Sequence, residues 1–212
     1  MTSVAHTKPT IIGRSSSHHT RVARIFAEEL GVDYELRVIR DLTSMDAAVY
    51  GGNPALKLPS LQTDSGVWFG ALNACRELAR LAPSSRRIVW PEDLKRALAA
   101  NAQELTVQAM ATEVSLIMAK VASAEGGAQY DKMRESLRNS LVWLERHVDA
   151  ALASLPSDRE LSYLEVALFC LVTHLEFRQV LPIGDYQQLN AFCDRFGARS
   201  SAKNTSYRFD AQ

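Results

Sequence analysis

The sequence is poor in cysteine and has no excess charge of either sign. Its three cysteines, Cys75, Cys170 and Cys193, are widely spaced and lie in helical patterns. Neither a disulfide framework nor a Cys-x-x-Cys metal or redox motif is available, and we expect buried small apolar side chains. The 24 Lys and Arg residues balance the 24 Asp and Glu residues, so no broad field favours nucleic acid or anionic lipid. We therefore expect small molecules or proteins as partners.

A long apolar run and the apolar core of a secretory signal are also lacking. The longest uninterrupted apolar run, residues 166–172, is far shorter than the roughly 20 residues that cross a bilayer. The first ten residues, MTSVAHTKPT, have no signal-like apolar segment. We expect a cytoplasmic protein that does not enter the membrane.

The first 83 residues alternate between strand and helix patterns. A β-branched run at residues 10–13 predicts a buried strand, residues 14–19 a polar loop, and residues 22–30 a helix that stops at Gly31. Residues 34–39 predict a second strand and residues 41–50 a weak helix. Two further strands, at 60–62 and 67–69, are joined by a turn and followed by a helix over 72–81. This order predicts a mixed sheet with helices packed on it.

Beyond a breaker-rich stretch the pattern is helical only. Pro91, followed by two carboxylates, predicts the start of a long helix, which the glycines at 126 and 127 end. Residues 133–152 carry a second apolar stripe, and a last helix over 186–196 precedes a polar tail. Ser162 and Glu165 form a capping box for an almost wholly apolar helix that extends to residue 177. We divide the chain into an α/β domain at 8–83, a linker at 84–90 and an all-helical domain at 91–212.

This order of elements resembles the soluble glutathione S-transferase superfamily over essentially the whole chain. The residues that carry the resemblance are RVARIFAEELGVDYE at 21–35, NPALKLP at 53–59, CRELA at 75–79 and the capping box. The resemblance implies a thioredoxin-like N-terminal domain followed by a helical-bundle C-terminal domain. It also implies a cytoplasmic homodimer with a detoxifying transferase activity, glutathione as co-substrate and no metal.

The resemblance further implies that the peptide bond before Pro59 is cis. The backbone of Leu58, the residue before it, would then pair with the cysteinyl part of glutathione, because such a bond turns the chain at the sheet edge. Lys57 stands where family members often contact the glutathione backbone or its glycine end. It could pair with a carboxylate there, or it could be an ordinary surface lysine.

In serine-type members of the family, the activating hydroxyl stands about six residues before the valine that matches Val22, which gives Ser16. A hydroxyl near a helix N-terminus can donate a hydrogen bond to a thiolate while the exposed amides favour the negative charge. We therefore expect Ser16 to stabilise the glutathione sulfur. Ser15 and Ser17 remain alternatives, and all three serines could be loop and cap residues without function.

Two features of this loop limit its chemistry. It contains no cysteine, so thiol-disulfide chemistry, which needs a nucleophilic sulfur, is disfavoured. Isomerase-like members carry Ser-Ser-Cys here, whereas this chain has Ser16-Ser17-His18. His18 and His19 are adjacent and should diverge, so we expect a solvated pair and not a metal site.

The sequence departs from the family pattern at the start of the third family helix. The usual Glu-Ser pair, which holds the γ-glutamyl group, is replaced by Gly70 and Ala71. The amide of Ala71 could still bind a carboxylate, but loss of the polar partners would weaken binding by roughly 10- to 100-fold. Asn73 is a good N-cap residue, and it could start the helix or replace part of the contact.

Three functional hypotheses follow. In the first, the chain transfers the glutathione thiol to a small hydrophobic electrophile. The electrophile could be held near Met110, Glu113 and Ile117 of the long helix, or these residues could be ordinary core or surface positions. In the second, it is a non-catalytic binding or regulatory protein of the same fold that has lost the glutathione site. In the third, it is a glutathione-dependent isomerase or lyase, which differs only in the electrophile.

Overall fold

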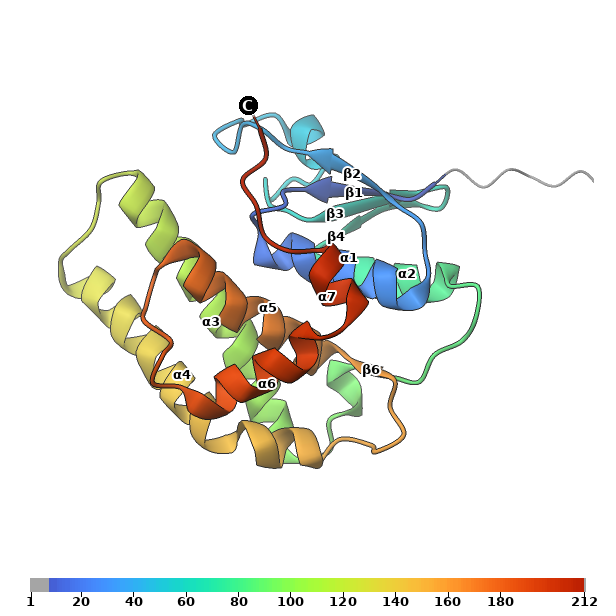
Figure 1. The fold of residues 1–212 in the computed structure, drawn as a ribbon. Coiled ribbons are helices and arrows are strands. Elements are labelled where there is room, and N and C mark those ends of the chain that lie inside the picture. Colours follow the sequence, from blue (N-terminus) through green and yellow to red (C-terminus); the bar gives the residue numbers. More distant parts are fainter. Residues whose placement is uncertain (1–7, 212) are drawn as a thin grey trace, which may run out of the picture. The chain divides into compact units, whose positions relative to one another are not determined.

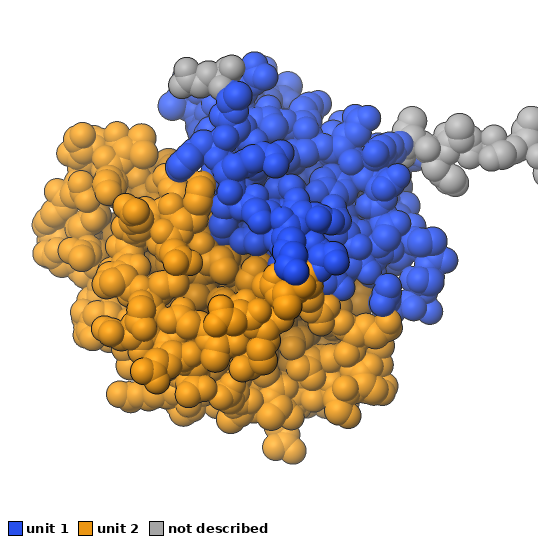
Figure 2. Space-filling model, in the orientation of Figure 1, with its two compact units in different colours: residues 1–86, 200–212 blue, residues 87–199 orange. Residues whose placement is uncertain are grey.

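The structure, a computed structural model, describes residues 8–211. They divide into two compact units (Figure 2). Unit 1 contains the described residues up to 86 together with those from 200 onward, and unit 2 contains residues 87–199. The sequence-based division assigned all residues from 91 to the helical domain. Residues 200–211 group with unit 1 instead, because the helix within them packs on the first helix of the chain.

Unit 1 is built on a mixed sheet with the strand order β2-β1-β3-β4 (Figure 1). Its strands are β1 (Thr10–Gly13), β2 (Glu35–Val38), β3 (Ser60–Thr63) and β4 (Gly66–Phe69). β1 runs parallel to β2 and antiparallel to β3, which in turn runs antiparallel to β4. This is the expected thioredoxin-like arrangement.

The helices of unit 1 are α1 (His18–Leu30), the single 3-10 turn η1 (Ala47–Tyr50), α2 (Ala71–Leu81) and the short α7 (Ser200–Asn204). α1 and α2 pack against each other on one side of the sheet (Figure 1). The opposite side is covered at one end by a cluster of Ile12, Ile39 and Tyr50. Only the turn η1 forms where a weak helix was expected at 41–50, and α7 lies in the segment described from the sequence as a polar tail.

Unit 2 is a helical bundle in which α5 is central. It comprises β5 (Ile88–Val89), the 3-10 turn η2 (Pro91–Asp93), α3 (Ala97–Val121), α4 (Ala128–Ala153), β6 (Leu161–Ser162), α5 (Tyr163–Arg178) and α6 (Gln187–Gly197). α5 packs against α3 and α6, and most of its side chains are buried. The amide of Glu165 donates to Ser162 Oγ at 3.1 Å, which confirms Ser162 as the N-cap. None of the helices within residues 8–211 is long and apolar enough to span a membrane.

Two expectations for unit 2 are wrong. The long helix does not begin at Pro91: Asp93 accepts a hydrogen bond from the amide of Trp90 and closes one 3-10 turn, and extended backbone at Leu94 and Arg96 separates this turn from α3. The unit also contains a short parallel pair, β5 with β6, where only helices were expected. Each of these strands has two residues, which is too few for a periodic pattern.

Candidate functional site

The two ends of the loop between β1 and α1 are each held by a contact with Thr20 of α1. Ser17 is the N-cap of α1, and its hydroxyl accepts a hydrogen bond from the amide of Thr20 at 3.2 Å. The amide of Arg14 donates to Thr20 Oγ1 at 3.3 Å. A Cβ atom on Gly13 would lie 2.3 Å from that same oxygen, so only glycine allows β1 and α1 to approach this closely.

The three serines of this loop have different environments. Ser15 is fully buried, and Ser17 is committed to the cap. Ser16 lies between them and retains 7% of its surface, one residue before the N-cap of a helix of 13 residues. His18 is the first residue of α1 and is buried, with its ring 4.3 Å from that of His19. The expectation of a solvated histidine pair is therefore wrong for His18, because the helix begins earlier than the apolar pattern indicated.

The proline loop contains a cis peptide bond and is held by a side chain of its own. The Leu58–Pro59 peptide bond is cis, as expected. The side chain of Asn53 holds the loop, donating to the carbonyl of Lys57 at 2.8 Å and accepting from the amide of Ala55 at 3.0 Å. The side chain of Lys57 is exposed. Asn53 is a positioning residue that the sequence suggested only as part of a breaker cluster.

α2 begins at Ala71 with Gly70 as its N-cap, and no side chain caps it. Gly70 has φ 82° and ψ 159°, a conformation that favours glycine. Asn73 therefore does not start the helix; its side chain is exposed and donates to the carbonyl of Phe69 at 3.1 Å. A Cβ atom on Gly70 would have nothing within 4 Å, so the reason for glycine here is its backbone conformation and not steric crowding.

The register of the sheet brings these segments to one edge of unit 1. Ile12 pairs with Ser60, and Ser60 pairs with Phe69. The next position along each of these three strands is Gly13, Pro59 and Gly70, respectively. The amide of Gly70 donates a hydrogen bond to the carbonyl of Pro59 at 2.9 Å. The predicted residues Ser16, Leu58, Pro59 and Ala71 thus lie in three chain segments that meet at the same edge.

The residues proposed for the electrophile are buried in unit 2. Met110, Glu113 and Ile117 recur at spacings of three and four on α3 and are at most 7% exposed. Glu113 Oε1 lies 2.7 Å from Nδ1 of His174 on α5, and both side chains are almost completely buried. In the sequence, His174 stands only two residues beyond the apolar run at 166–172, so no local pattern indicates this pair.

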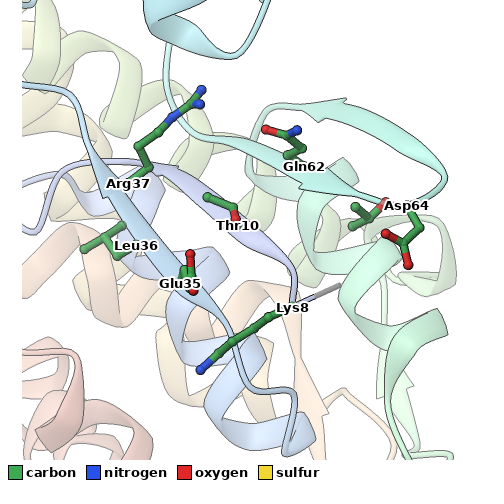
Figure 3. A pocket seen from close by; sticks show the side chains of 8 residues that line it. Lys8, Thr10, Glu35, Leu36, Arg37, Gln62 and Asp64 are labelled. Carbon is green, nitrogen blue, oxygen red and sulfur yellow. The ribbon is translucent and has the colours of Figure 1, made fainter. Parts of the chain in front are cut away.

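A separate hollow of about 580 Å³ lies on the sheet of unit 1 (Figure 3). Polar side chains from adjacent strands line it, including Thr10, Glu35, Arg37 and Gln62. They share one face of the sheet because they occupy matching register positions. None of the predicted site residues lines this hollow.

Comparison with known proteins relates the N-terminal part of the chain to one protein family. Residues 16–81 match the family model described as the N-terminal domain of glutathione S-transferase. The matched range contains Ser16, Leu58, Pro59 and Ala71. No curated protein matches the chain.

Several solved structures share the fold over nearly the whole chain. A glutathione transferase family member from Pseudomonas fluorescens Pf-5 with bound glutathione is 23% identical, with 94% of this chain and 99% of that chain covered and a TM-score of 0.76. A glutathione S-transferase from Methylobacillus flagellatus KT with glutathione bound is 17% identical, covers 94% and 100% of the two chains, and has a TM-score of 0.74. A third, from Methylobacterium radiotolerans JCM 2831 in complex with glutathione sulfonate, is 18% identical, covers 97% and 98%, and has a TM-score of 0.72.

Proposed function

We propose that this chain binds glutathione at the edge of the sheet in unit 1. The chain has the glutathione S-transferase fold. The match of its N-terminal part to the family model supports membership of that superfamily. We propose further that the chain transfers the glutathione thiol to a small hydrophobic electrophile. The observation that carries the proposal is the convergence of the Ser16 loop, the cis Leu58–Pro59 segment and the uncapped start of α2. Structures of the same fold contain glutathione or its sulfonate.

Most of this site is made of backbone groups. The first amides of a helix have no partner within the helix, and together with the helix dipole they attract a carboxylate. The start of α2, which has no side-chain cap, would hold the γ-glutamyl carboxylate through the amide of Ala71. The backbone of Leu58 would pair with the cysteinyl part, and Lys57 would pair with a carboxylate of the ligand from its exposed position.

Ser16 would stabilise the glutathione thiolate. Its position just before the N-cap of α1 allows a hydroxyl donor and the positive end of the helix to act on the same negative charge. Ser15 is the weaker alternative because it has no exposed surface. Ser17 is weaker because the N-cap contact with the Thr20 amide fixes the orientation of its side chain. Ser16 is therefore the serine that fits the role best.

A second candidate function is a binding or regulatory protein of this fold without catalysis. The specific observation in its favour is the absence of polar side chains at Gly70 and Ala71. A glutathione-dependent isomerase or lyase would use the same thiolate and differ only in the electrophile. The homodimer, the cytoplasmic location and the detoxifying role remain predictions from the resemblance.

The test is the ionisation of bound glutathione in Ser16→Ala, read from the ultraviolet absorbance of the thiolate, together with the rate of conjugation to chlorodinitrobenzene. Loss of one hydrogen bond to a charged group should raise the pKa of the bound thiol and slow conjugation by roughly 10-fold or more. Ser15→Ala is the matched control and should change neither. Unchanged thiol pKa and rate in Ser16→Ala would move the role to Ser15, Ser17 or the backbone. Bound thiolate without conjugation of any electrophile would favour the non-catalytic protein.

A further inference from the structure

The C-terminal segment, residues 200–211, packs against α1 within unit 1 (Figure 1). Ser201 Oγ donates to Glu29 Oε1 at 2.5 Å, and Asn204 Nδ2 donates to Glu28 Oε2 at 2.9 Å. Arg24 Nη2 lies 3.4 Å from the carbonyl oxygen of Asn204. α7 therefore lies on α1 through contacts along the helix.

Arg21 extends this attachment beyond α7. It is buried on α1, and its Nη2 donates to the carbonyl of Ala202 at 3.0 Å, while its Nε lies 3.4 Å from Thr205 Oγ1. Its guanidinium lies 4.2 Å from the centre of the Tyr207 ring, within the range of a cation–π contact. The chain is thus held as far as Tyr207, three residues before Asp210.

Asp210 reaches the loop between β1 and α1. Its Oδ2 accepts a hydrogen bond from the amide of Ser15 at 2.9 Å, across 195 residues of sequence. Ser15 is fully buried, and a buried amide without a partner would cost free energy. An ionised carboxylate is a stronger acceptor for such an amide than a neutral group.

This contact acts directly beside Ser16. The neighbouring amides of the loop are bonded locally, that of Arg14 to Thr20 Oγ1 and that of Ser17 to the carbonyl of Arg14. The amide of Ser15, in contrast, depends on a residue from the other end of the chain. The peptide that leads into Ser16 is therefore held by Asp210.

We propose that Asp210 is a positioning residue of the glutathione site: by accepting from the amide of Ser15, it fixes the loop that presents the Ser16 hydroxyl to the thiol. The catalytic consequence of this contact rests on the proposed function. The hydrogen bond between Asp210 and the Ser15 amide itself is independent of any ligand. Asparagine at 210 keeps an oxygen acceptor without the charge, whereas alanine removes the acceptor. The two substitutions therefore separate hydrogen bonding from charge.

The experiment uses the full chain as Asp210→Ala, Asp210→Asn and the control Asp33→Ala, an exposed acid of unit 1. Without glutathione, amide hydrogen exchange at Ser15 should become roughly 10- to 100-fold faster in Asp210→Ala, and asparagine should restore most of the protection. With glutathione, Asp210→Ala should raise the pKa of the bound thiol and lower kcat more than it changes KM, because the contacts at Leu58 and α2 remain. Asp33→Ala should match the unaltered chain throughout.

The outcomes separate this proposal from the proposed function. Normal exchange, thiol pKa and kcat in Asp210→Ala, in a chain that binds glutathione, would overturn the role of Asp210 alone. Equal losses in Asp210→Ala and Asp210→Asn would overturn the hydrogen-bonding role and indicate an effect of charge. Absence of glutathione binding by the unaltered chain would overturn the proposed function, and with it the catalytic consequence assigned to Asp210.

Discussion

The amide of Gly70 donates a hydrogen bond to the carbonyl of Pro59 at 2.9 Å and so joins the cis-proline loop to the start of α2. The two segments lie on neighbouring strands that pair at Ser60 and Phe69. Their relative position is therefore determined by backbone contacts. The two groups that we propose to face the ligand, the backbone of Leu58 and the amide of Ala71, depend little on side-chain identity.

Substitution of Gly70 tests whether its backbone conformation requires glycine. Gly70→Ala should lower the free energy of unfolding by about 1 to 3 kcal/mol, because φ is 82° there even though the space around it is open. Urea unfolding measures the loss. Gly184→Ala is the matched control, since its Cβ would also meet nothing within 4 Å and its φ lies outside the region that side chains rarely adopt. An equal change in both variants would contradict a conformational role for Gly70.

Ala71 is the position at which the missing hydroxyl can be restored without backbone strain. Ala71→Ser should tighten glutathione binding by roughly 10-fold, because it adds one hydrogen bond to a charged group beside the first amide of α2. Isothermal calorimetry measures the change, and Ala79→Ser on the same helix should have no effect. Identical affinities for Ala71→Ser and the unaltered chain would move the γ-glutamyl group away from this position.

Glu165 should make the stability depend on pH. Burial alone would raise the pKa of this carboxyl, but hydrogen bonds from Arg159 and Ser162 hold it below its ordinary value of 4.5. A lowered folded pKa contributes stability above the unfolded pKa, and this contribution is lost as the pH falls through the folded value. Glu165→Gln should therefore be less stable at neutral pH and lose less stability on acidification below about pH 4.5. Urea midpoints across this range provide the measurement, with Glu104→Gln on exposed α3 surface as the control. Parallel pH curves for Glu165→Gln and the unaltered chain would refute the prediction.

The buried pair in unit 2 should stabilise the packing of α3 on α5. His174→Leu removes a hydrogen-bond partner of Glu113, whose side chain has no exposed surface, and should cost about 2 to 3 kcal/mol. The double variant with Glu113→Leu should recover part of this loss, because it no longer buries the carboxylate. Denaturant unfolding of the two single variants and the double variant measures the coupling. Strictly additive losses would show that the two side chains do not stabilise each other.

Much of the fold could be predicted because local patterns and tertiary packing agree. The apolar spacing before Gly31 places α1, and the capping box places the start of α5 at Ser162. The order of elements led to the glutathione S-transferase fold and to the cis bond at Pro59. These features depend on periodicity and on a few residues with restricted conformations.

The remaining features depend on contacts that no local pattern encodes. Asp210 and Ser15 are 195 residues apart, and nothing in the tail marks an acceptor for a buried amide. Asn53 acts through its side chain on its own loop, which breaker composition alone does not indicate. From the sequence, Gly70 is interpreted as the loss of the usual glutamate side chain. In the structure its positive φ favours glycine at this position, which is a separate reason for the residue. Local composition is compatible with several such arrangements, and packing selects among them.

Calorimetric titration of the full chain with glutathione tests the central claim most directly, with cysteinylglycine, which lacks the γ-glutamyl group, as the control ligand. The arrangement of Leu58, Pro59 and the uncapped start of α2 predicts saturable binding of glutathione in the millimolar range or tighter, and weaker binding of cysteinylglycine. No detectable binding at millimolar glutathione would contradict it.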